Sequence, residues 1–471
     1  MAGAMSGRPE RSGGACRRRV VRAIVLLLLG VAGAASVAGG AARSGASSRG
    51  VAPPAGVGEF TGPATCDSSS CHGSSRPRDG RIAQDEFATW FRDDAHRQAY
   101  DVLHAPLGQA MGRRLGIDVT TAAECLACHA SPQQVATAGV GLGAGIAANP
   151  VVEFGVSCEA CHGASSGWYG AHFQRGFDRA AAVASHGLID TKEATTLAGK
   201  CLECHLGDAT RFVDHRLIAA GHPELRFELG SYLLAMGSHW RQRGSGSRDW
   251  FLRAALAGPL VAVERQLRQV AREAGGATAA VDWSNRDCAA CHHDLDDAGW
   301  DRVRDWRLEH GMAVPVGLAQ LDGSRFVAAL AVARSLGGAE PFARSLAQVE
   351  QLAHAMPFDG AALAEAALAA AEQSRERATA LTAEGQVAVV ADAVIAELRA
   401  AVDAIAGGGL PAAEHSAQLL HSLQAAFAPE TWQLAPDGAA ADVRAQLLAP
   451  LHSTREFAPA DFATAWRSLG R

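Results

Sequence analysis

Apolar side chains in the last third of the chain recur at intervals of three and four residues, which is the spacing of one face of an α-helix. Turns that contain Gly or Pro interrupt this pattern. The pattern predicts helices over 324–336, 341–355, 360–382, 386–406, 411–428 and 438–449. Asp359 lies where it would cap the third of these helices. We therefore expect residues 313–471 to form an antiparallel, alanine-rich helical domain.

Two earlier stretches have the same periodicity. Apolar residues along 86–103 predict an amphipathic helix, and those along Trp250–Ala274 predict a long helix with a bend near Pro259. The fold class that we expect is mainly α.

The N-terminal segment has the pattern of a secretory signal peptide. Four arginines precede an apolar run that opens at Ile24, and small residues follow, with plausible cleavage after Ala38 or Ala42. The alternative is an uncleaved membrane anchor, since residues 23–42 carry no charge and are about long enough to span a bilayer. The small residues favour cleavage, so we expect residues 1–42 to be a signal for export.

Composition and charge narrow the class of protein. Hydrophobic residues make up 48% of the chain, which is ordinary for a globular protein, but aromatic residues make up only 6% and cannot dominate the core. Residues 1–42 hold six Arg and one Glu, so the net charge changes from −6 to −11 when they are removed. This negative charge argues against nucleic acid as a partner. Residues 43–60 are rich in Gly, Ala, Pro and Ser, which is typical of a flexible linker.

The cysteines carry the most specific signal. Cys16 lies in the predicted signal, and the other ten cysteines form five close pairs, each followed at once by a histidine. Chance would produce five such coincidences about once in ten million sequences, so the pattern needs a chemical reason. The pairs and their histidines are Cys66/Cys71/His72, Cys125/Cys128/His129, Cys158/Cys161/His162, Cys201/Cys204/His205 and Cys288/Cys291/His292.

The spacing Cys-x-x-Cys-His is the signature of covalent c-type haem attachment. Both thiols add to the vinyl groups of one haem, and the adjacent histidine binds the iron. The first pair has four spacer residues, Asp67–Ser70, which are small and polar and suited to an outward bulge. We therefore predict five covalent haem c groups, whose large apolar bodies also explain the low aromatic content.

Two alternatives for the cysteines remain. A structural zinc site takes four ligands, whereas each Cys₂His set would be one ligand short, and no fourth ligand repeats at a fixed spacing. Disulfides within the pairs are the other alternative, and a thioredoxin-like site would need a βαβ context that is not visible here.

Second axial ligands are sought among the other histidines, because methionine is scarce beyond the signal. Two histidine ligands per iron imply a lower potential than one histidine and one methionine. The candidates that the local pattern favours are His96, His172, His215 and His222. The last two are seven residues apart and would share a face if that stretch were helical. In the cysteine-free tail, His354, His415, His421 and His452 are expected to be ordinary surface residues.

Several stretches together resemble multihaem cytochromes of the cytochrome c-554 family: CDSSSCHG, DDAHRQAY, CLACHASP, GVSCEACHG, CLECHLGD, DHRLIAAGHPELRFEL, AMGSHWR and CAACHHDL. The resemblance runs from about Cys66 to Trp306. It implies helical, loop-rich haem packing, two histidines per iron and electron transfer in the periplasm. It adds His239 to the other four predicted distal ligands, without saying which serves which iron. The chain departs from the family's four haems by a fifth motif and a long C-terminal extension.

Three functions are consistent with these features. The first is an exported electron carrier with a pentahaem domain over 61–312, working between redox partner proteins. The second is an oxidoreductase with one open haem that acts on a small nitrogen or sulfur compound; a Cys-x-x-Cys-Lys motif that would favour this is not present. The third makes the helical tail a docking module within a redox complex. An uncleaved N-terminus would add membrane association.

Overall fold

The structure is a computed structural model, and it describes residues 58–79, 82–131, 152–236, 239, 245–276, 281–288, 291–292, 302–312, 320–383, 385–427 and 457–468. All of these belong to one of the two units into which the chain divides, Ala52–Arg471. The predicted signal segment, most of the predicted linker and the predicted helix over 438–449 lie outside the described residues.

The described residues are mainly helical, which confirms the predicted fold class. Within those ranges the β-structure is one isolated bridge between Arg286 and Leu321. None of the helices found there is both long enough and apolar enough to cross a bilayer.

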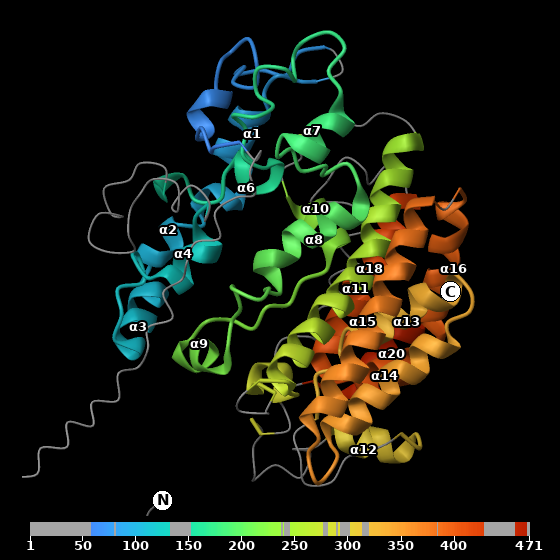
Figure 1. The fold of residues 1–471 in the computed structure, drawn as a ribbon. Coiled ribbons are helices and arrows are strands. Elements are labelled where there is room, and N and C mark those ends of the chain that lie inside the picture. Colours follow the sequence, from blue (N-terminus) through green and yellow to red (C-terminus); the bar gives the residue numbers. More distant parts are fainter. Residues whose placement is uncertain are drawn as a thin grey trace, which may run out of the picture. The chain divides into compact units, whose positions relative to one another are not determined.

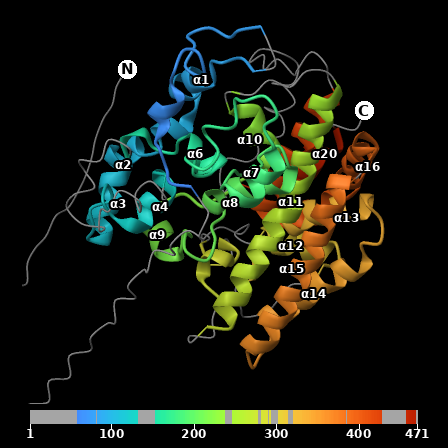
Figure 2. The same ribbon diagram turned by 45° about the horizontal axis from the view of Figure 1, so that its top comes forward.

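Short helices joined by loops make up the described residues before position 240 (Figures 1 and 2). They are η1 (Pro63–Cys66), α1 (Glu86–Asp93), η2 (Ala95–Gln98), α2 (Asp101–His104), α3 (Pro106–Leu115), α4 (Ala123–His129), η4 (Val152–Phe154), α6 (Cys158–His162), α7 (Arg179–Ser185), α8 (Ala194–His205), α9 (His215–Ala220) and α10 (Leu229–Ala235). Side-chain carboxylates cap several of them; Glu193, for example, accepts from two backbone N–H groups at the start of α8.

Further helices follow, and the longer ones among them lie side by side (Figure 1). They are α11 (Ser245–Ala274), η5 (Trp283–Asn285), α12 (Arg302–Glu309), α13 (Phe326–Ser335), α14 (Glu340–Ala353), α15 (Gly360–Ala383), α16 (Val387–Ala400), α17 (Val402–Gly407), α18 (Gly409–Phe427) and α20 (Pro459–Ser468). The helical periodicity therefore gave correct predictions for α11, α13, α14, α15 and α18. The cap at Asp359 is also confirmed, because its carboxylate accepts from the Ala362 N–H at 3.0 Å.

Two helix predictions need correction. The helix expected over 386–406 is interrupted at Ala401, which separates α16 from α17. The helix α20 had no counterpart in the prediction, although its buried Phe462 and Trp466 anchor it to the core.

The long helix α11 is the centre of the main core. Side chains of α8, α10 and α11 pack in one apolar cluster with those of the later helices. Ser374 of α15 donates to the Leu260 carbonyl oxygen at 2.8 Å, and Arg253 donates to the Leu381 carbonyl oxygen at 2.9 Å. The apolar face of α8, which includes Ala198 and Leu202, is fully covered by this cluster. The helix that carries the fourth cysteine motif is therefore held by the helical core. The predicted division at residues 312 and 313 stays a prediction.

Candidate haem-binding sites

Three of the five motifs end a helix. The helices α4, α6 and α8 each end at the motif histidine. Successive residues of an α-helix are separated by about 100°, so positions i, i+3 and i+4 share one face. The spacing Cys-x-x-Cys-His consequently presents two thiols and one imidazole on the same side, as one flat ligand would require.

The first motif uses a turn instead of a helix. The N–H groups of Cys71 and Gly73 both donate to the Ser68 carbonyl oxygen, at 2.8 and 3.0 Å. The four spacer residues are exposed, so the extra length loops outward as predicted. A Cβ atom at Gly73 would lie 1.7 Å from the Asp67 carbonyl oxygen, and this position therefore requires glycine.

The fifth motif also closes one turn of chain. The His292 N–H donates to the Cys288 carbonyl oxygen at 2.8 Å, and the Cys291 N–H donates to the same oxygen at 3.2 Å. The two spacer residues lie outside the described ranges.

Each motif histidine faces one histidine from another part of the chain. The pairs, with the distance between ring centroids, are His72–His172 (6.2 Å), His129–His222 (6.3 Å), His162–His239 (6.4 Å), His205–His96 (6.0 Å) and His292–His215 (6.2 Å). The structure thus brings together all ten histidines named from the sequence, and every one of the five second histidines is used once.

These distances fit a metal held between two imidazoles. An imidazole nitrogen binds a transition metal at about 2.0 Å, and two such bonds in line place the ring centroids about 6 Å apart. The described cysteines are not joined in disulfides. Two thiols for covalent attachment and two imidazoles for the iron are the groups that a c-type haem with histidine on both faces of the ring requires.

Asp94 positions His96, the histidine that faces the motif histidine His205. Its carboxylate is 5% exposed and accepts from both the backbone N–H and Nδ1 of His96, each at 2.9 Å. The backbone of Asp94 is extended, so the helix expected over 86–103 breaks here into α1, η2 and α2. That break lets His96 face His205 at the end of α8.

The end of a helix separates His215 from His222, which would share a face if the whole stretch were helical. The helix α9 starts at His215, where the Asp214 carboxylate caps the Leu217 N–H at 2.8 Å. Gly221 has φ +117°, which ends the helix, so His222 lies beyond it. The two histidines therefore do not share a helix face, and each faces the histidine of a different motif.

In several of the paired histidines, Nδ1, the ring nitrogen that points away from the facing histidine, has a hydrogen-bond partner that fixes the orientation of the ring. Nδ1 of His72 lies 2.9 Å from the Glu86 carboxylate. Backbone carbonyl oxygens are the partners of three others: Ala99 for His129 (2.7 Å), Tyr169 for His172 (2.5 Å) and Pro223 for His222 (2.7 Å). Such contacts at Nδ1 direct Nε2 toward the opposite ring and raise the basicity of the ligand.

Burial and hydrogen bonds set the protonation of these rings. Burial lowers the pKa of His162 and that of His205 to about 4, which keeps both imidazoles neutral and able to bind a metal. The hydrogen bond to Glu86 raises the pKa of His72. Burial acts to lower the pKa of His96, but the hydrogen bond to Asp94 and the negative charge of Asp94 together outweigh it, and the net shift is upward.

Thiols of different motifs are neighbours in two places. Cys66 of the first motif is hydrogen-bonded to Cys158 of the third, and this contact lowers the pKa of Cys66. Cys128 of the second motif is hydrogen-bonded to Cys204 of the fourth, which lowers the pKa of Cys204 to about 7. The first motif therefore adjoins the third, and the second adjoins the fourth.

Comparison with known proteins agrees with this chemistry. Residues 65–163, which contain the first three motifs, match the family described as cytochrome c554 and c-prime. The match supports a c-type cytochrome. A cytochrome of this class carries covalently bound haem c and transfers electrons. The match covers 99 of the 471 residues, and no curated protein and no solved structure matches the chain significantly.

A buried carboxylate beside the first and third motifs escaped the sequence analysis. Glu159, inside the third motif, is 1% exposed and accepts from the backbone N–H groups of Thr61 (3.0 Å), Gly62 (2.8 Å) and Ser165 (2.8 Å). It ties the segment that leads into the first motif to the third motif. The only sequence signal was an acidic residue inside a haem-attachment motif.

One histidine of the cysteine-free tail is wrongly predicted. His415 was expected at the surface but is 4% exposed, because α18 is covered on most of its sides. His354 accepts from the Leu321 N–H at 3.0 Å and is half-buried, and His452 lies outside the described residues.

Proposed function

We propose that this chain is an exported pentahaem c-type cytochrome that passes single electrons between redox partner proteins. The observation that carries the proposal is the facing histidine at each of five cysteine motifs, with ring centroids 6.0 to 6.4 Å apart. Covalently bound haem supplies one-electron exchange at its iron.

The chain's own residues would have three tasks at each site. The two thiols would tether the haem, and the motif histidine with its facing histidine would coordinate the iron. Partners of the outer ring nitrogens, such as Glu86 for His72, would fix the ring orientation and the electron density of the ligand.

The arrangement of the motifs supports a series of sites. The thiol contacts join the first motif to the third and the second to the fourth. Cys161 of the third motif interacts electrostatically with Cys204 of the fourth. The helix α9 and Gly221 connect His215, which faces the fifth motif, to His222, which faces the second. The order of neighbours is first, third, fourth, second, fifth, which suits electron transfer between two separate ends.

Counting covalent haems tests this proposal. The mature protein, expressed with a haem-maturation system, should carry five haems per chain by pyridine haemochrome absorbance and by intact mass. The double variant C288S/C291S should carry four. Fewer than five haems on the fully matured wild-type chain would contradict the proposal.

Carbon monoxide binding separates the carrier from the open-haem oxidoreductase. Because every motif histidine faces a second imidazole, we expect the reduced protein not to bind carbon monoxide. Binding of one equivalent per chain would favour the enzyme alternative.

The periplasmic location is part of the same proposal. It is supported by the basic region, apolar run and small residues before position 43. We expect the protein in the periplasmic fraction to begin after Ala38 or Ala42 on N-terminal sequencing. Recovery of the intact N-terminus in the membrane fraction would instead indicate an uncleaved anchor.

A further inference from the structure

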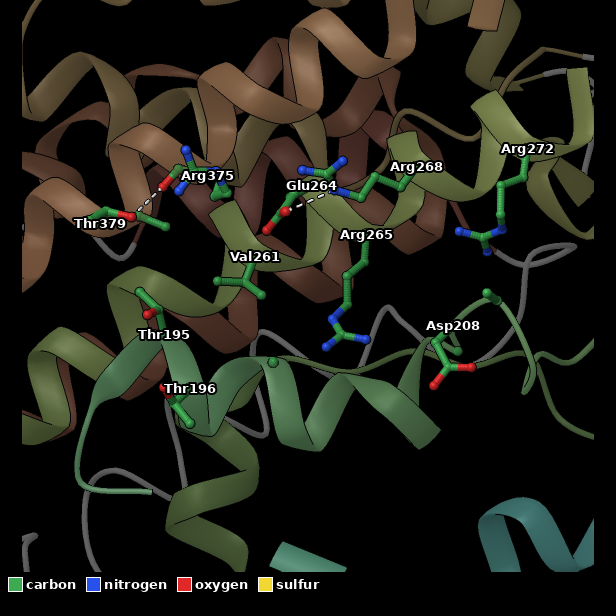
Figure 3. A pocket seen from close by; sticks show the side chains of 14 residues that line it. Thr195, Thr196, Asp208, Val261, Glu264, Arg265, Arg268, Arg272, Arg375 and Thr379 are labelled. Carbon is green, nitrogen blue, oxygen red and sulfur yellow. Dashed lines mark hydrogen bonds and ion pairs between the residues drawn. The ribbon is translucent and has the colours of Figure 1, made fainter. Parts of the chain in front are cut away.

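A pocket lined by arginines lies between α8, α11 and α15. Its volume is about 500 Å³, within the range of about 300–1,000 Å³ that small-molecule sites occupy. Arg265, Arg268 and Arg272 of α11 and Arg375 of α15 line it. Figure 3 shows Arg265 and Arg272 pointing from α11 toward α8 and the loop that carries Asp208.

Two of these arginines already have carboxylate partners. Arg268 Nε donates to Glu264 at 2.9 Å, and Arg375 forms an ion pair with Glu372. The Asp208 carboxylate is occupied by its ion pair with Arg211.

Arg265 and Arg272 have no hydrogen-bond or ion-pair partner among the described residues. Arg265 is half-buried, so its guanidinium has lost part of its hydration without gaining a protein acceptor. The pocket thus holds two positive charges that the surrounding chain does not offset.

The α8 wall of the pocket is distinct from the haem-binding face of the same helix. Thr195, Thr196 and Gly199 line the pocket, whereas Cys201, Cys204 and His205 belong to the fourth motif. At about 100° per residue the two sets lie on roughly opposite sides of α8. A group attached to the fourth motif would therefore not fill this pocket.

Small residues of α8 leave room at this wall. A Cβ atom at Gly199 would lie 3.4 Å from Arg265 Nη2, so glycine allows the guanidinium to lie close to the helix. The Thr196 side chain also lines this wall and adds a hydroxyl group to it.

We propose that this pocket binds a small, multiply charged oxyanion of the phosphate or carboxylate type. The planar guanidinium fork matches the oxygen geometry of both groups, and two unpaired forks suit a ligand with at least two negative charges. A neutral or cationic ligand would leave both charges without a counterion. The inference is independent of the number of haems and of the proposed electron transfer.

Isothermal titration of the full mature chain tests this site. The probes are inorganic pyrophosphate and citrate, each at constant ionic strength set with potassium chloride. We expect saturable binding of one equivalent for at least one probe, and the tighter probe identifies the phosphate or the carboxylate class. No saturable binding of either probe would overturn the proposal.

Charge-removing variants locate the binding. The double variant R265Q/R272Q should weaken the tighter probe at least tenfold, since each lost guanidinium removes a charge-assisted contact. R344Q, which removes an exposed arginine of α14 outside the pocket, should bind as the wild type does. If the double variant does not fold, R272Q alone, at an exposed position, should still weaken binding. Unchanged affinity in a folded variant would show that the anion binds elsewhere.

Discussion

At the scale of single residues, the five histidine pairs differ in what holds their outer ring nitrogens. A carboxylate is the partner at His72 and at His96, whereas backbone carbonyl oxygens are the partners at His129, His172 and His222. A carboxylate makes an imidazole a stronger electron donor than a neutral carbonyl does. We therefore expect the irons of the first and fourth sites to be the hardest to reduce.

The variant E86Q tests this expectation. Replacing the carboxylate with an amide should raise the midpoint potential of one haem by on the order of 50 mV, because the His72 imidazole becomes a weaker donor. Spectroelectrochemical titration would resolve the shift. The exposed Glu365 of α15 provides a matched control, and E365Q should leave all potentials in place. Identical titration curves for E86Q and the wild type would rule out tuning by Glu86.

The residue pattern predicted the chemistry of the cysteine motifs but not their neighbours. The spacing of Cys and His is a local property, so it could be read from the sequence. The pairing of His162 with His239 joins residues 77 positions apart and depends on how the loops between them fold. The same holds for Glu159, whose backbone partners Thr61 and Gly62 lie nearly a hundred residues earlier.

At the scale of helices, the buried cap of α10 makes stability depend on pH. The Glu228 carboxylate accepts from the N–H groups of Gly230 (2.9 Å) and Ser231 (2.7 Å), and burial raises its pKa from 4.5 to about 7. Between these values the folded chain holds a proton that the unfolded chain has released. Glu228 therefore lowers the stability progressively as the pH rises from about 4.5 to 7.

The variant E228Q should remove this dependence. Relative to the wild type, its free energy of unfolding should increase by roughly 3 kcal/mol between pH 4 and pH 8, because Gln cannot ionise. Denaturant unfolding at the two pH values measures the difference. A difference that is the same at both values would mean that the pKa of Glu228 is not raised in the folded chain.

The helix α11 links the fourth motif to the helical core. Leu260 of α11 is fully buried, whereas Leu368 of α15 is 46% exposed. We expect L260A to lower the free energy of unfolding by about 2–5 kcal/mol and L368A by far less, because only the first leaves a cavity. Thermal unfolding followed in the far ultraviolet compares them. Equal effects would contradict the central position of α11.

Helix prediction succeeded where periodicity ran without interruption. Apolar side chains recur regularly in five helices because each buries at least one face along its length: α11, α13, α14, α15 and α18. It failed at Asp94, where side-chain capping of His96 outweighs the periodicity, and at Ala401, where the sequence has no helix-breaking residue. The sequence shows Arg265, Arg268 and Arg272 at helical spacing in α11. That they line a pocket depends on the residues of α8 that lie opposite, which the sequence does not show.

At the scale of the whole molecule, the chain brings ten histidines from distant segments into five pairs. Five of these histidines lie at or beside the ends of short helices, and the other five lie in turns or loops. Regular helices would fix the direction of each ring by periodicity alone. Helix ends and turns instead let each imidazole be set by its own cap or hydrogen bond.

Electron paramagnetic resonance of the oxidised full chain tests the central claim most directly, because it separates irons by their axial ligands. With a histidine on both sides of every iron, we predict that all five haems are low-spin. The variant H222A should convert one of them, the second, to high-spin. A high-spin signal from the intact wild type, or an unchanged spectrum in H222A, would contradict the account.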